Sequence, residues 1–85
     1  MSGEPERVNT SEALTLIRKY ADDGVQILGV DGFLVAPEGF YASLDLLLDV
    51  SGRDLTAAQA AAECGAFVKS KARPDVVWEV WTEAS

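Results

Sequence analysis

The 85-residue chain contains no histidine and a single cysteine, Cys64. Without histidine, Ser-His and Cys-His nucleophilic catalysis and imidazole general base catalysis are excluded. Most zinc sites need histidines or several cysteines, so no metal centre is expected. The glycine-rich patterns that bind phosphates, GxxxxGK[ST] and GxGxxG, are also missing. We therefore predict that the protein is not an enzyme and that it binds no metal or cofactor.

The scarcity of cysteine and of long apolar runs also limits where the protein acts. A lone cysteine cannot form an internal disulfide, and small proteins of oxidising compartments usually have several cysteines. No apolar run approaches the roughly 18 residues that cross a bilayer. The polar residues 1–9 lack the apolar core of a signal peptide. We expect a cytoplasmic protein, with residues 1–9 as a disordered lead-in and residues 10–83 as a single domain.

Basic residues are absent between Tyr20 and Gly52. The same stretch contains six acidic residues, Asp22, Asp23, Asp31, Glu38, Asp45 and Asp49. The isoelectric point of about 4.3 argues against nucleic acid as a partner, because that binding depends on Lys and Arg neutralising phosphates. The same charge repels an anionic membrane surface. A one-signed field attracts cationic partners, although an acidic surface often serves only solubility.

Two helices are predicted from their capping patterns. Asn9 with Glu12, and Thr56 with Gln59, have the spacing of a capping box. The first helix is expected over residues 10–23, where apolar residues recur at helical spacing and a glycine follows. The second is expected over residues 57–72, where Pro74 blocks continuation. Cys64 lies among alanines of this second helix, so we expect a buried, unreactive thiol.

Two apolar runs, Val25–Val30 and Phe33–Ala36, are joined by Asp31-Gly32. Asp-Gly between apolar runs is a strong local signal for a two-residue hairpin turn. We therefore predict two strands, with Asp31 serving the turn. Gly29, inside the first run, indicates a bulge or a close approach of another backbone.

Two further segments complete the predicted sheet. Residues 40–50 alternate apolar and polar side chains and favour a strand, although Leu44, Leu47 and Leu48 also fit one face of a helix. Val76–Thr82 alternates β-branched and aromatic residues, which is typical of a strand.

The predicted order is α-β-β-β-α-β, an α+β two-layer sandwich with both helices on one face of a mixed four-stranded sheet. The three consecutive strands form a meander, and the last strand joins parallel to a neighbour through a right-handed crossover. The order of elements alone resembles the double-stranded RNA-binding domain. That resemblance implies a basic start to the second helix, but residues 54–59 contain no basic residue, which argues against RNA binding.

These features favour a small acidic protein-binding module, of the inhibitor or immunity (antitoxin) type, that covers a basic partner such as a nuclease toxin. Charge complementarity would speed its association. One of the two tryptophans is expected in the core and the other at the surface, where an exposed Trp can anchor an interface. The candidate contact residues are Asp31, Glu38, Asp45, Asp49, Trp78 and Trp81.

Two alternatives remain open. The first is a homodimer, or a subunit of a larger assembly, joined through an open sheet face or an edge strand. The second is a small-molecule-binding or enzymatic domain that uses carboxylates in a concave pocket.

Overall fold

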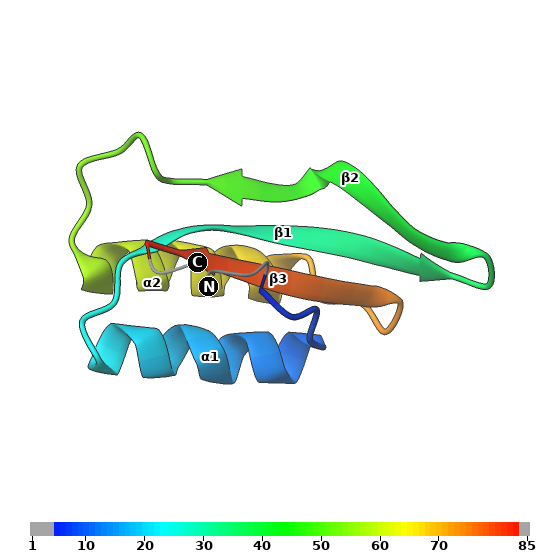
Figure 1. The fold of residues 1–85 in the computed structure, drawn as a ribbon, viewed down its shortest axis with the longest axis horizontal. Helices are drawn as coiled ribbons and strands as arrows, with labels where there is room; N and C mark the ends of the chain where they lie inside the picture. The colour runs from blue at the N-terminus through cyan, green and yellow to red at the C-terminus, as the bar shows by residue number, and fades with distance from the viewer. Residues whose placement is uncertain (1–4, 84–85) are drawn as a thin grey trace.

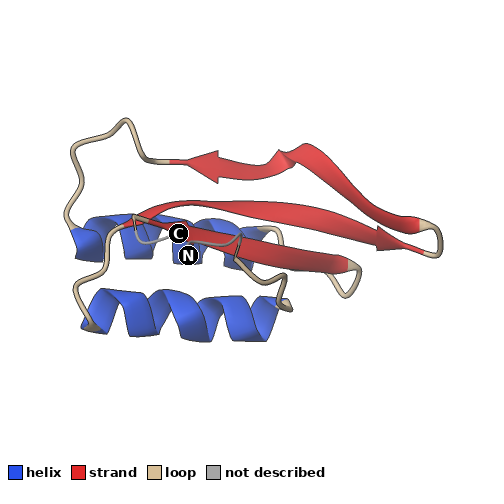
Figure 2. Cartoon of the chain, in the orientation of Figure 1, coloured by secondary structure: helices blue, strands red, loops and turns tan. Residues whose placement is uncertain are grey.

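A three-stranded antiparallel sheet is covered on one face by two helices (Figure 1). The computed structural model describes residues 5–83. The elements follow one another as α1 (Thr10–Asp22), β1 (Ile27–Ala36), β2 (Gly39–Asp49), α2 (Ala57–Ser70) and β3 (Val76–Thr82). Figure 2 separates the helical layer from the sheet, whose strand order is β2-β1-β3. The α+β class was therefore predicted correctly, whereas the four-stranded mixed sheet was not.

Both helices begin at the capping boxes that the sequence indicates. At α1, the amide of Glu12 donates to the Asn9 side chain over 2.8 Å, and the Asn9 amide donates to the Glu12 carboxylate over 3.1 Å. Thr56 and Gln59 exchange the same two bonds at 3.0 and 2.9 Å. Each pair satisfies two backbone N–H groups that have no partner inside the helix. The predicted helix starts are confirmed.

The predicted hairpin turn at Asp31-Gly32 is wrong, because β1 runs straight through both residues. The turn lies later, at Pro37-Glu38, where Ala36 pairs with Gly39. Gly32 lies inside β1, at a position with no room for a side chain. A Cβ there would lie 2.7 Å from the Cβ of Leu46 and 2.9 Å from the Trp78 ring. The glycine thus allows Leu46 and Trp78 to pack closely against the backbone of β1. The two strands predicted on either side of Asp31-Gly32 are a single strand.

The direction of β3 also differs from the prediction. β3 pairs antiparallel with β1, with Val30 opposite Val80 and Phe33 opposite Val77. Since β2 is antiparallel to β1 as well, β2 and β3 run the same way. The connection through α2 therefore joins two strands of equal direction, but β1 lies between them, so the predicted parallel neighbour of the last strand is wrong. No described strand has a parallel neighbour.

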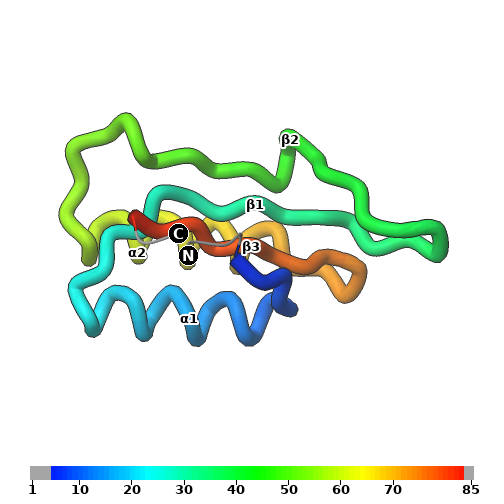
Figure 3. The backbone as a smooth tube through the Cα atoms, in the orientation of Figure 1, coloured from blue at the N-terminus to red at the C-terminus, as the bar shows by residue number. Residues whose placement is uncertain are grey.

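The segment predicted as a strand over residues 40–50 is found as β2 (Gly39–Asp49), as the alternation favours, but the strand is irregular. Asp31 pairs with Leu47 and Phe33 pairs with Ala42, so residues 43–46 face the single residue Gly32. Such an insertion bends a strand, and Figure 3 shows the bend in β2. Within it, Leu44 is 87% exposed whereas Leu46 is buried. The bulge therefore separates one leucine from the core and inserts another.

The core lies between the sheet and the helices. Val76, Trp78 and Val80 of β3 face the helical layer and are buried. The Trp78 ring meets Phe67 of α2 edge-on, at 6.2 Å between centroids, and its Nε1 donates to the Thr10 hydroxyl over 3.1 Å. The remaining buried apolar side chains are Ala13, Ile17, Ile27, Val30, Leu46, Val50, Ala60, Ala61, Cys64 and Val68. Cys64 is buried as predicted, and burial raises the pKa of its thiol to about 11.

The N-terminal segment joins the free edge of β3. Val8 exchanges two backbone hydrogen bonds with Trp78, at 2.8 and 2.7 Å. Residues 1–4 of the predicted disordered lead-in lie outside the described residues, but this later part of it pairs with the sheet. No helix within residues 5–83 is both long and apolar enough to cross a membrane.

Candidate partner-binding surface

The β1–β2 hairpin extends past the ends of the helices (Figure 1). It presents apolar side chains to solvent. All exposed large hydrophobic residues of the described chain lie on it: Val35, Phe40, Tyr41, Leu44 and Leu47. β2 is the outermost strand of the sheet, so one side of its backbone has no strand partner within residues 5–83. Unpaired edges and grouped apolar side chains are typical of interaction sites. We call β2 with these five side chains the hairpin surface.

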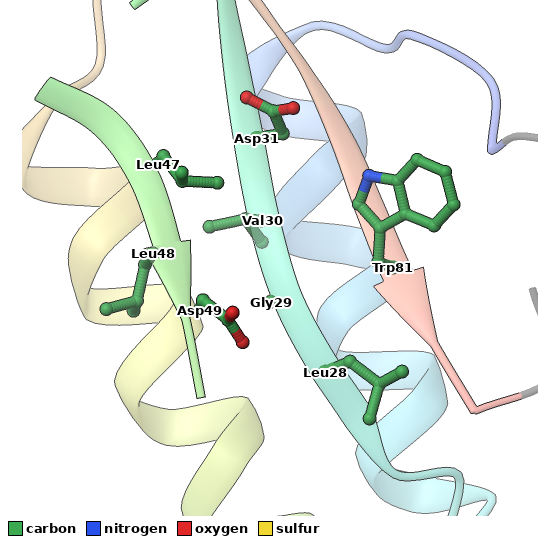
Figure 4. A pocket seen from close by; sticks show the side chains of 8 residues that line it. All are labelled: Leu28, Gly29, Val30, Asp31, Leu47, Leu48, Asp49 and Trp81. Atoms are coloured by element: carbon green, nitrogen blue, oxygen red, sulfur yellow. The ribbon is translucent and has the colours of Figure 1, made fainter. Parts of the chain in front are cut away.

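A pocket of about 220 Å³ lies beside the hairpin surface, where residues of β1, β2 and β3 meet. It is lined by Leu28, Gly29, Val30, Asp31, Leu47, Leu48, Asp49 and Trp81. Figure 4 shows that Asp31, Asp49 and Trp81 come from three different strands. The pocket is smaller than the roughly 300–1,000 Å³ of most small-molecule sites. Its size is better suited to one side chain of a partner.

Gly29 allows β1 and β2 to approach closely at this pocket. A Cβ at Gly29 would collide with the carbonyl oxygen of Leu48 and would lie 3.2 Å from the Cα of Asp49. The register of β1 against β3 shifts between Ile27 and Gly29. The sequence prediction of a bulge or close approach at Gly29 is thus confirmed. The consequence is that Asp49 is held next to the centre of the sheet.

The carboxylates at the pocket are in different electrostatic settings. Burial raises the pKa of Asp31, and the positive charge of Arg7 opposes that rise. The Ser51 hydroxyl donates to Asp49 over 2.6 Å and the Ser51 amide over 2.9 Å, and these bonds lower the pKa of Asp49. Among residues 5–83, no basic side chain lines the pocket. A cation entering the pocket would therefore meet the carboxylates of Asp31 and Asp49.

Next to the pocket, a buried carboxylate is paired with a cation from the N-terminal segment. Glu79 lies opposite Asp31 in the β1–β3 register, and its side chain is only 6% exposed. The Arg7 Nε donates to the Glu79 Oε2 over 3.1 Å. The Arg7 guanidinium carbon also lies 4.4 Å from the centre of the Phe33 ring and 4.9 Å from that of Phe40.

The structure brings together three of the six predicted contact residues, namely Asp31, Asp49 and Trp81. Asp45 is exposed on β2 and Glu38 is exposed in the hairpin turn, and neither lines the pocket. Trp78 is completely buried, so it is corrected from a contact residue to a core residue. Trp81 is the tryptophan that reaches the surface.

Arg7 and Glu79 were not predicted as site residues. Strand alternation in Val76–Thr82 places Glu79 on the same face as Trp81, which was a usable signal. No local pattern indicates that Arg7 reaches it across the length of the chain. Within residues 5–83, no group of three or more His, Cys, Asp or Glu side chains could hold a metal ion.

No protein-family model matches this chain, and no curated protein matches it. No solved structure matches it either.

Proposed function

We propose that the protein is an acidic binding module, of the inhibitor or immunity type, that covers a basic protein partner such as a nuclease toxin. The observation that carries the proposal is that exposed apolar residues and acidic residues occur together on one hairpin. β1 and β2 contain the exposed apolar side chains and three acidic residues, Asp31, Asp45 and Asp49, but no basic residue. Apolar contact supplies affinity, and the one-signed charge selects a cationic partner.

The pocket suits a lysine or arginine side chain of that partner. The Trp81 ring offers a face for a cation, and the carboxylates of Asp31 and Asp49 accept charge-assisted hydrogen bonds. Leu28 and Leu47 line the pocket with apolar surface, against which the methylene groups of a long basic side chain can pack. The unpaired edge of β2 can at the same time accept an extended segment by strand addition.

The test begins with capture of partners from a lysate of the source cell at low and at moderate salt. The association rate of the purified partner is then measured for the wild type, Asp31→Asn and Asp22→Asn. The two variants remove the same charge, but Asp22 lies on α1, outside the pocket. We expect an association rate that falls steeply with salt, and a larger decrease in that rate for Asp31→Asn than for Asp22→Asn. A salt-independent rate, or equal effects of the two variants, would contradict the proposal.

A homodimer through β2 is the second candidate, favoured by the 87% exposure of Leu44 on an unpaired edge strand. The charge counts against it, because two copies of β2 would bring Asp45 and Asp49 of both chains into one interface. Sedimentation velocity from micromolar to high concentration distinguishes the two. A dimer that Leu44→Lys dissociates would support self-association, and a monomer throughout would exclude it.

A further inference from the structure

The cation beside Glu79 is supplied from outside the sheet. The three strands contain no basic residue, and Glu79 is nonetheless nearly buried. A buried carboxylate is costly unless it is paired with a cation and hydrogen-bonded. Arg7, which lies three residues before α1, supplies both the charge and the hydrogen bond.

The surroundings of the Arg7 head group match the chemistry of a guanidinium. Two aromatic rings, Phe33 and Phe40, lie within 5 Å of its central carbon, at 4.4 and 4.9 Å. A flat, weakly hydrated guanidinium stacks on aromatic faces and can still donate to a carboxylate at its edge. The strongly hydrated ammonium of a lysine fits this combination less well.

The backbone pairing of the N-terminal segment does not depend on the Arg7 side chain. The backbone pairing with β3 is made by Val8, through its two hydrogen bonds to Trp78, and the Arg7 side chain is 39% exposed. An open hollow of about 550 Å³ lies beside it, lined by Pro5, Glu6, Arg7, Phe40 and Glu79. A basic side chain from another molecule therefore has a route to Glu79 from solvent.

We propose that Phe33, Phe40 and Glu79 form a guanidinium-binding site, which Arg7 fills in the free protein and which an arginine of a basic partner enters in its place. The second half rests on the proposed function, whereas the first concerns this chain alone. Arg7 keeps Glu79 paired before binding and competes with the incoming arginine. Because of this competition, the apparent dissociation constant equals the intrinsic one divided by the fraction of molecules whose site is free.

The site itself is tested by chemical rescue of Arg7→Ala with ethylguanidinium. We expect this variant to have a lower melting temperature than the wild type. Millimolar ethylguanidinium should recover part of that loss and shift the NMR signals of the Phe33 and Phe40 rings. Ethylammonium, which has the same charge without the planar group, is the matched control. Equal responses to the two cations would overturn the site.

Two further variants keep the site testable if Arg7→Ala does not fold. Arg7→Lys retains the charge, and we expect it to be less stable than the wild type and to show weaker ring contacts. Arg7→Ala combined with Glu79→Gln removes the unpaired charge and should fold without responding to ethylguanidinium. Rescue of this double variant to the same extent would also overturn the site.

Displacement is tested with a synthetic peptide that alternates apolar residues with arginine, and with its lysine counterpart. If Arg7 competes, Arg7→Ala should bind the arginine peptide several-fold more tightly than the wild type does, with a smaller gain for the lysine peptide. Equal affinities of variant and wild type would refute the competition while leaving the proposed function intact. Rescue by ethylguanidinium without peptide binding to either protein would support the site and count against a basic partner.

Discussion

Replacing Gly29 with alanine should force β1 and β2 apart at the pocket. The added Cβ would overlap the Leu48 carbonyl oxygen and lie 3.2 Å from the Cα of Asp49. Both obstacles are backbone atoms, so no side-chain rotation can relieve the overlap. The strands themselves must move by a substantial part of an ångström, in a ladder whose spacing is about 4.8 Å.

The expected loss follows from what such a movement breaks. Overpacking costs about 1–3 kcal/mol, and two weakened ladder hydrogen bonds add about 1 kcal/mol each. We therefore expect Gly29→Ala to lower the free energy of unfolding by about 3–5 kcal/mol. A domain of this length has a total free energy of unfolding of roughly 4–13 kcal/mol. The loss is a large fraction of that total, so the variant should unfold at a clearly lower urea concentration than the wild type.

Urea denaturation followed by tryptophan fluorescence measures this loss, because Trp78 passes from a fully buried site to solvent. Gly52→Ala is the matched control, since no atom lies within 4 Å of a Cβ at that position. The control should stay within about 0.5 kcal/mol of the wild type. A Gly29→Ala variant as stable as the control would refute the close approach of the two strands.

Three further predictions concern single side chains. Asp31→Asn should stabilise the protein at neutral pH, because burial raises the folded-state pKa of Asp31 and so penalises its charged form. That gain should shrink as pH falls through the raised pKa toward 3.8, the ordinary value, and a pH-independent difference in urea titrations would contradict it. Cys64, with its thiol pKa raised to about 11, should react with a disulfide reagent at pH 8 only when urea unfolds the chain, and rapid labelling of the native protein would show the thiol to be accessible. Thr56→Ala should cost about 1 kcal/mol through loss of the cap at Gln59, and unchanged thermal stability would mean that the cap contributes nothing.

Features encoded within a few neighbouring residues could be predicted from the sequence. The capping pairs Asn9–Glu12 and Thr56–Gln59 span one helical turn each, and they mark the starts of α1 and α2 correctly. Alternation located β3, and Gly29 indicated the close approach. The misplaced turn at Asp31-Gly32 has the opposite origin. Leu46 and Trp78, both distant in the sequence, require a glycine at position 32, and this requirement overrides the local turn signal.

In the candidate site, too, only the residues marked by local patterns could be predicted. The run of acidic residues and the period of the strands indicated Asp31, Asp49 and Trp81, which the sheet brings to one pocket. The pairing of Arg7 with Glu79 joins the two ends of the described chain. It depends on β3 lying beside β1 and on Val8 lying beside β3, neither of which a local pattern encodes.

β2 is attached to the molecule mainly through β1, and neither helix packs extensively along it. Its opening would uncover Leu46 but leave the helices packed on β1 and β3. Proteins open locally in units that cost less free energy than global unfolding. We expect β2 to be such a unit, because it is held mainly by one neighbouring strand. Its amides should exchange with deuterium before those of β1, which has a strand on both sides. A ligand bound along this edge would slow that exchange, so the least protected strand of the free protein would report occupancy most sensitively.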